Sequence, residues 1–183
     1  MYLQLIEEDC KVMKRGFSLF SVLVVVFFIA TISGCGKRLS ETELYNQAKS
    51  HEKNEEFKKA AQTYVKLAKR FPNGQYAAES LFRGAIIYSN NLTDYDQSVR
   101  LHEKLYKTYP KSEYAPQALF MIGFTYANDV KDCDKAKKYY QQFLTKFPNS
   151  ELAASVQWEL NNLGKDINEL DFLSKPTSEQ SAQ

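Results

Sequence analysis

Hydrophobic positions in residues 41–165 recur at helical spacing, in pairs of amphipathic segments separated by short polar breaks. In one segment Leu119, Ile122 and Tyr126 share a helical face, and a polar break follows them. An aromatic residue and a proline close each pair, and the three closures lie 38 residues apart, at Phe71-Pro72, Tyr109-Pro110 and Phe147-Pro148. Repetition at a fixed period of this length predicts an all-α solenoid, in which no helix pair buries its apolar face alone.

The N-terminal stretch has the organisation of an export signal. Met13-Lys14-Arg15 is basic, and an apolar run of about 16 residues follows at 17–32, shorter than the ~20 residues that a spanning helix needs. The run ends in Ile32-Ser33-Gly34-Cys35, which resembles a bacterial lipobox. The resemblance implies cleavage before Cys35 and acylation of its thiol and new amine. The alternative is an uncleaved N-terminal anchor helix with an incidental cysteine.

These features predict four regions. Residues 1–34 form a signal peptide, residues 35–40 an acylated tether, residues 41–165 the repeat domain, and residues 166–183 a Ser/Gln-containing tail that we expect to be largely disordered.

Two details bear on where translation starts and to which membrane the export signal directs the chain. The acidic residues between Met1 and Val12 are unusual for a signal peptide, so translation starts at either Met1 or Met13. Gly36 stands where an aspartate retains such lipoproteins in the inner membrane. The resemblance therefore implies the periplasmic face of the outer membrane, or the cytoplasmic membrane in a host that has no outer membrane.

The repeats themselves resemble a known helical motif. The segment 118–126 resembles the first helix of a tetratricopeptide repeat (TPR), and Ala136, Tyr140 and Phe143 fit the second helix. The resemblance implies a TPR-like helical solenoid of three helix pairs behind the lipoprotein signal peptide. Residues 151–163 form one more amphipathic segment without a partner, which predicts a capping helix over the last repeat.

Aligning the repeats gives an interpretation of three chemically versatile residues. Cys133 aligns with Phe57 and Tyr95, which predicts a small buried hydrophobe. The alternative is a reactive thiol or one that pairs with a partner. His51 and His102 occupy positions that hold tyrosine in other repeats, so we expect both to line the core rather than to act in catalysis.

Composition and motifs indicate a binding protein rather than an enzyme. The 24 Lys+Arg nearly balance the 22 Asp+Glu, which gives no electrostatic reason to expect nucleic acid. The sequence has no phosphate-binding loop and no paired Cys or His motif, and its carboxylates show no evident pairing, so we predict no catalytic residue, cofactor or metal. Lys58-Lys59 and Lys137-Lys138 match between repeats. They form either a stripe that touches anionic lipid headgroups or an ordinary solvated face.

One set of positions suggests a binding surface. In TPR superhelices, one position of each first helix faces the concave groove. In this sequence that position holds an aromatic residue in four successive first helices, and the residues one helical turn later form a second row of candidate groove positions. An aromatic ladder suits an extended or helical peptide that is rich in apolar or aromatic residues. The alternative is that the rings only pack the inner helices together. The candidate groove residues are Tyr45, Phe82, Ile86, Phe120, Phe124 and Trp158.

The lipobox together with the aromatic-Pro turns is similar to the outer-membrane assembly lipoprotein family BamD, also called YfiO, over roughly residues 40–165. The resemblance implies a non-enzymatic scaffold that helps to insert β-barrel proteins. It would contact their terminal segments and the barrel-forming partner. That family typically carries five repeats, whereas this sequence shows three and a cap.

Two other functions stay open. The first is that of a shorter TPR protein like the CpoB (YbgF) family, which acts with Tol-Pal to coordinate envelope constriction with peptidoglycan synthesis. The N-terminal coiled coil of that family is absent here. The second is that of an envelope enzyme, which would need a polar triad or metal cluster.

Overall fold

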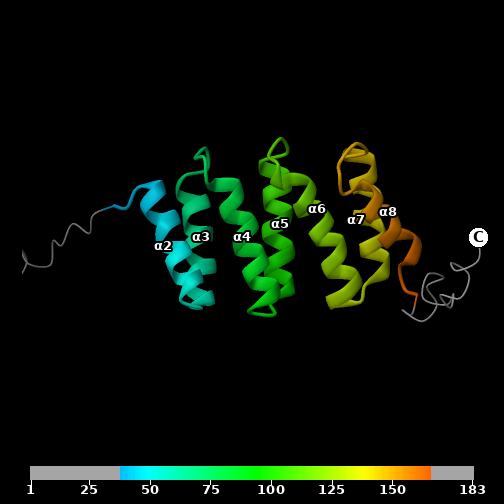
Figure 1. Cartoon of the computed structure of the whole chain (residues 1–183), viewed down its shortest axis with the longest axis horizontal. Coiled ribbons are helices and arrows are strands. Elements are labelled where there is room, and N and C mark those ends of the chain that lie inside the picture. Colours follow the sequence, from blue (N-terminus) through cyan, green and yellow to red (C-terminus); the bar gives the residue numbers. More distant parts are fainter. Residues whose placement is uncertain (1–37, 166–183) are drawn as a thin grey trace, which may run out of the picture. The chain divides into compact units, whose positions relative to one another are not determined.

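A computed structural model of the chain describes residues 38–165, and this part contains helices and no strand. Figure 1 shows the described helices side by side in chain order. They are α2 (Glu41–Lys53), α3 (Phe57–Arg70), α4 (Ala77–Asn90), α5 (Tyr95–Thr108), α6 (Tyr114–Thr125), the π-helical turn η1 (Tyr126–Val130), α7 (Cys133–Lys146) and α8 (Ala153–Asn162). The all-α, TPR-like prediction is confirmed. The predicted signal peptide, the predicted acylation of Cys35, the choice of start codon and the predicted disordered tail lie outside the described residues.

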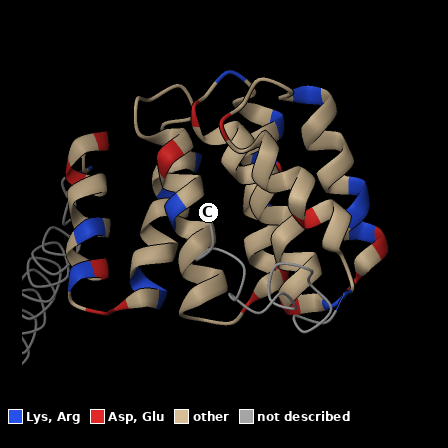
Figure 2. Cartoon of the chain, turned by 45° about the vertical axis from the view of Figure 1, so that its right-hand side comes forward, with Lys and Arg blue, Asp and Glu red and all other residues tan. Residues whose placement is uncertain are grey.

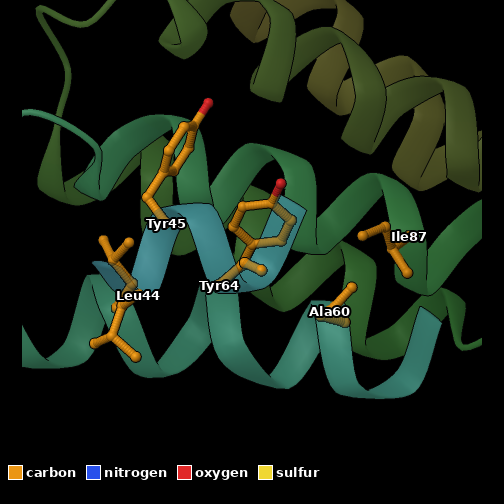
Figure 3. Packing of buried hydrophobic residues seen from close by; sticks show 8 residues of the cluster. Leu44, Tyr45, Ala60, Tyr64 and Ile87 are labelled. Atoms are coloured by element: carbon orange, nitrogen blue, oxygen red, sulfur yellow. The ribbon is translucent and has the colours of Figure 1, made fainter. Parts of the chain in front are cut away.

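The helices pack as successive pairs, α2/α3, α4/α5 and α6/α7, and α8 packs on α7 where the sequence predicts a capping helix. The first helices α4 and α6 also contact each other directly. Figure 3 shows the core of the first pair, in which Leu44, Ala60 and Tyr64 meet Ile87 from α4 of the next pair. Each pair therefore completes its core with a residue of its neighbour, as expected for a solenoid.

The three aromatic-Pro turns have nearly the same backbone. Phe71, Tyr109 and Phe147 have φ angles of −124°, −125° and −130°, and each donates its N–H to the carbonyl four residues earlier at 2.8 Å. Proline keeps the preceding residue out of the α-helical region, so each second helix ends at its aromatic residue. The chain then enters the next first helix through a buried alanine, Ala77 or Ala115 in the first two turns.

A second set of turns, inside each helix pair, also repeats every 38 residues. Glu55, Thr93 and Lys131 are left-handed, with φ of 58°, 51° and 62°. Glutamate, threonine and lysine do not indicate a left-handed turn, because glycine and asparagine are the residues that usually adopt this conformation. In two of the pairs the next residue, Asp94 or Asp132, caps the second helix by accepting the N–H three residues later at 3.0 Å.

Two of the three expectations for Cys133 and the histidines are corrected. Cys133 is exposed, not buried, because its position is the first residue of a second helix, where even Phe57 and Tyr95 are only half-buried. His102 is fully buried, as predicted. His51 is half-buried at a turn, with Nδ1 2.5 Å from Glu56 Oε2, and so does not belong to the core.

Candidate interaction surface

Four of the predicted groove residues form two half-exposed apolar pairs on neighbouring first helices. Phe82 and Ile86 lie one turn apart on α4, and Phe120 and Phe124 lie one turn apart on α6. Residues four apart share a helical face, and the Phe120 and Phe124 rings are 5.8 Å apart between centroids. The sequence correctly pairs these side chains, and their exposure leaves apolar area available to a ligand.

The α4 pair opens into a pocket of about 240 Å³. Phe82 forms its apolar wall with Tyr114, whose ring centroid is 5.4 Å away, and the other edge of Phe82 packs against His102 at 5.5 Å. Tyr114, the first residue of α6, is not among the predicted groove residues. The lining residues are Glu52, Glu79, Phe82, Arg83, Ile86 and Tyr114.

The polar side of this pocket is formed by charged residues of α2 and α4, which tyrosine hydroxyls from α2 and α3 also contact. Arg83 Nε donates to Glu79 Oε1 at 2.7 Å, and its Nη1 lies 3.6 Å from Glu52 Oε2. The hydroxyl of Tyr45 donates to Glu79 at 2.6 Å, and that of Tyr64 donates to Glu52 at 2.7 Å. The sequence analysis found no evident pairing among the carboxylates and did not foresee these contacts to arginine and tyrosine. The spacing of four between Glu79 and Arg83 is the signal in the sequence that could have indicated the ion pair.

The network fixes the charge of its members. Burial pushes the pKa of Glu79 upward, but the hydrogen bonds from Tyr45 and Arg83 outweigh it, so the pKa of Glu79 is lowered. The hydrogen bond to Glu79 raises the pKa of Arg83. Burial, followed by the bond to Glu79, raises the pKa of Tyr45 to about 12. The pocket thus presents a carboxylate and a guanidinium at neutral pH beside an apolar wall.

The other two predicted groove residues, Tyr45 and Trp158, do not line this pocket. Tyr45 is 8% exposed, stacks on Tyr76 at 4.1 Å and makes an edge contact with Tyr64. Trp158 is 46% exposed and lines a different pocket, of about 500 Å³, together with Cys133. Within residues 38–165 the rings therefore do not form one continuous ladder. Instead, Tyr45 serves packing and hydrogen bonding.

A comparison with known protein families identifies the chain's relatives. The family described as "YfiO: Outer membrane lipoprotein" matches residues 37–172, which is more than half of the chain. The chain belongs to the YfiO outer membrane lipoprotein family. The match includes every helix from α2 to α8. A search of curated proteins found no match.

YfiO-family proteins are non-enzymatic lipoprotein scaffolds. In this member, residues 38–165 contain no group of three or more His, Cys, Asp or Glu side chains that is placed to hold a metal ion. Over the same residues, no helix combines the length and apolar character needed to cross a bilayer. What the described surface does offer is the pocket at Phe82 and the half-exposed rings of Phe120 and Phe124, which are features of a binding surface.

Proposed function

We propose that this YfiO-family chain is a lipid-anchored interaction scaffold of the bacterial envelope that takes part in the assembly of outer-membrane β-barrel proteins. The observation that carries the proposal is the family match over residues 37–172. The lipobox-like Ile32–Cys35 segment supplies the anchor in this proposal, and the helical repeats supply a rigid surface for partners.

The partner segment in this proposal is a peptide with apolar or aromatic side chains. It lies across α4 and α6, where it covers the exposed parts of Phe82, Ile86, Phe120 and Phe124. Aromatic rings give a large contact area at low conformational-entropy cost, which suits a surface that accepts related segments from many clients. The charged wall around Arg83 gives the site a polar side that can fix the direction of the peptide.

The test is a crosslinking capture from membranes with the full-length chain as bait. Recovery of β-barrel assembly components supports the proposal. Recovery of Tol-Pal or peptidoglycan factors supports the CpoB-like alternative instead. A Phe120→Ala/Phe124→Ala variant should lose the captured partner while its circular dichroism stays helical. Because Phe120 also stacks on Tyr140 at 6.2 Å, Phe124→Ala alone is the second variant if the double one unfolds.

The control for this capture changes apolar side chains away from the α4/α6 surface. Val130, which is 42% exposed, and Tyr95, which is half-buried, lie beside the left-handed turns at Lys131 and Thr93, outside α4 and α6. A Tyr95→Ala/Val130→Ala variant should capture partners as the unmodified chain does. Unchanged capture by the Phe120 and Phe124 variants would rule out the proposed peptide surface.

A further inference from the structure

Charge is segregated between the two kinds of helix in this fold. The second helices α3, α5 and α7 carry five, three and four basic residues, but only zero, two and one acidic residues. The first helices α2, α4 and α6 together with α8 carry three basic and five acidic residues. Figure 2 marks the basic residues in blue and the acidic residues in red along the ribbon. The net charge of the whole chain is near zero, but its basic residues are concentrated on the second helices.

The basic residues concentrate on one stripe of each second helix. Positions 62, 66 and 70 of α3 are four residues apart and share a face. Their equivalents lie 38 and 76 residues later on α5 and α7. Six of these nine positions are basic, the other three are Gln62, Thr108 and Gln142, and none is acidic. The basic stripe consists of Lys66, Arg70, Arg100, Lys104, Lys138 and Lys146, all of which are exposed.

The three parts of the basic stripe face the same side because the repeats have matching geometry. Both sets of turns recur with nearly the same backbone angles every 38 residues. Each second helix also turns the same positions into the core, with Leu67, Leu105 and Phe143 fully buried. The stripe lies on the helical face opposite Tyr64, His102 and Tyr140, which are also fully buried, so it continues from one second helix to the next.

The charge of the basic stripe is only partly offset within the described chain: Glu103 interacts electrostatically with Lys138, and Asp134 lies one helical turn before it. Lys59, Lys107 and Lys135, which border the stripe on the second helices, each pair with a nearby carboxylate. None of the six stripe residues forms an ion pair within residues 38–165. The Arg70 guanidinium lies over the Phe71 ring at 5.2 Å, and Arg100 donates only to a neutral glutamine. The stripe is therefore a predominantly basic surface that is open to an anionic partner.

We propose that the basic stripe docks on the anionic phospholipid headgroups of the membrane leaflet that holds the chain. This inference rests on the anchor at Cys35 in the proposed function. Five residues lead from Cys35 to Ser40, and they reach at most about 18 Å even when fully extended. Two of them, Lys37 and Arg38, are basic as well. In this proposal the short tether joins the start of α2 to the lipid anchor, and the headgroup layer there carries charge complementary to that of the stripe.

A lipid surface fits the stripe better than a compact ligand does. The six basic residues are spread over three helices, and none of them lines the described pockets around Phe82 or Trp158. The nine stripe positions carry no apolar side chain, so nothing on the stripe would insert into hydrocarbon. Many phosphates spread over a plane match such a surface, whereas an enclosed pocket for one compact ligand does not.

The test measures how strongly the full chain partitions onto vesicles of phosphatidylcholine alone and of phosphatidylcholine with phosphatidylglycerol. Trp158, the single tryptophan, serves as donor for energy transfer to a dansyl lipid. The ratio of the two partition coefficients isolates the electrostatic part of binding. A Lys66→Gln/Lys104→Gln/Lys138→Gln variant should lower this ratio roughly a hundredfold, at about fivefold for each lysine. High salt should lower it similarly.

The matched control removes three positive charges elsewhere. Lys53, Lys111 and Lys165 are exposed and lie outside the second helices, so their triple Gln variant should change the ratio only a few-fold. Equal partitioning on both vesicle types, or equal losses in the two variants, would overturn the inference. Loss of a captured acidic protein from the stripe variant, with no effect of vesicle composition, would make that protein the occupant instead.

This test separates the inference from the proposed function. The vesicles contain no envelope protein, so a failure to capture β-barrel assembly components leaves the partition ratio valid. A failure of acylation at Cys35 lowers binding to both vesicle types alike, and the ratio cancels that loss. Conversely, a partition ratio that stays the same in the stripe variant would overturn this inference but would say nothing against the capture of assembly components through α4 and α6.

Discussion

The hydroxyl of Tyr45 on α2 donates to Glu79 Oε1 on α4 at 2.6 Å, which links the first helices of two successive repeats. The bond holds a ring that is 8% exposed between Tyr76 and Tyr64. It also orders one end of the network that holds Arg83 at the pocket wall. The first helices are thus joined by a charge-assisted bond as well as by apolar packing.

Replacement of Tyr45 by Phe should lower the free energy of unfolding by about 1.5–3 kcal/mol, the range for a hydrogen bond to a charged group. The ring stays in place, so the loss reports the hydroxyl. Urea unfolding followed by circular dichroism measures it. In the control, Tyr106→Phe, the lost hydroxyl accepts only from the neutral Gln142 amide at 3.2 Å, and the expected loss is about 0.5 kcal/mol. Similar losses in both variants would contradict the special role of the Tyr45 bond.

Cys133 should behave as a surface thiol. In a chain with Cys10 and Cys35 replaced by serine, Ellman's reagent should label Cys133 at nearly the same rate in native protein and in urea, because the side chain is exposed. Addition of Cys133→Ser should abolish the signal. Labelling that needs urea would restore the buried position expected from the repeat alignment.

The repeat pattern was sufficient to predict the helices and the turns that separate the pairs. Proline restricts its predecessor wherever it occurs, so the closures at Phe71, Tyr109 and Phe147 follow from local chemistry. The 3.6-residue period identifies the buried face of each helix without knowledge of the partner helix. For the same reason Phe82 with Ile86, and Phe120 with Phe124, are correctly paired on one face.

The remaining features depend on contacts between elements that are far apart in sequence. Tyr45 leaves the predicted groove because Glu79, 34 residues later, accepts its hydroxyl. Tyr114 joins the Phe82 pocket because the turn before α6 places it there. The burial of Cys133 was predicted wrongly because an aligned position in the repeat does not show how far the core extends toward the end of a helix. The left-handed residues are fixed by the closing geometry of each pair and not by their own preferences.

Two glycines inside helices should respond oppositely to alanine. A Cβ on Gly123 in α6 would lie 2.6 Å from ring atoms of the fully buried Tyr140, whereas a Cβ on Gly84 in α4 would meet Leu101 at an ordinary 3.6 Å. Gly123→Ala should therefore cost about 1–3 kcal/mol through overpacking. Gly84→Ala should gain up to about 1 kcal/mol from helix propensity. The unfolding temperatures of the two variants test this prediction. A stabilised Gly123→Ala variant would show that the Tyr140 ring can move aside.

His102 makes the stability of this fold sensitive to mild acid. The side chain is fully buried in α5, neither ring nitrogen has a hydrogen-bond partner, and burial lowers the pKa of His102 to about 3. In the unfolded chain its pKa is about 6.5, so between these values only the unfolded state binds the proton. The free energy of unfolding should therefore fall as the pH drops below about 6.5, by about 1.4 kcal/mol for each pH unit.

His102→Phe should remove this dependence, because phenylalanine keeps an apolar ring against Phe82 and cannot take up a proton. Between pH 7 and pH 5 the unmodified chain should lose about 2 kcal/mol more than the variant in urea unfolding. Carboxylates titrate alike in both chains, so the difference between the two pH curves isolates His102 even if the larger ring strains the core at every pH. Parallel curves would show that water or a polar neighbour reaches the imidazole and lets it ionise in the folded state.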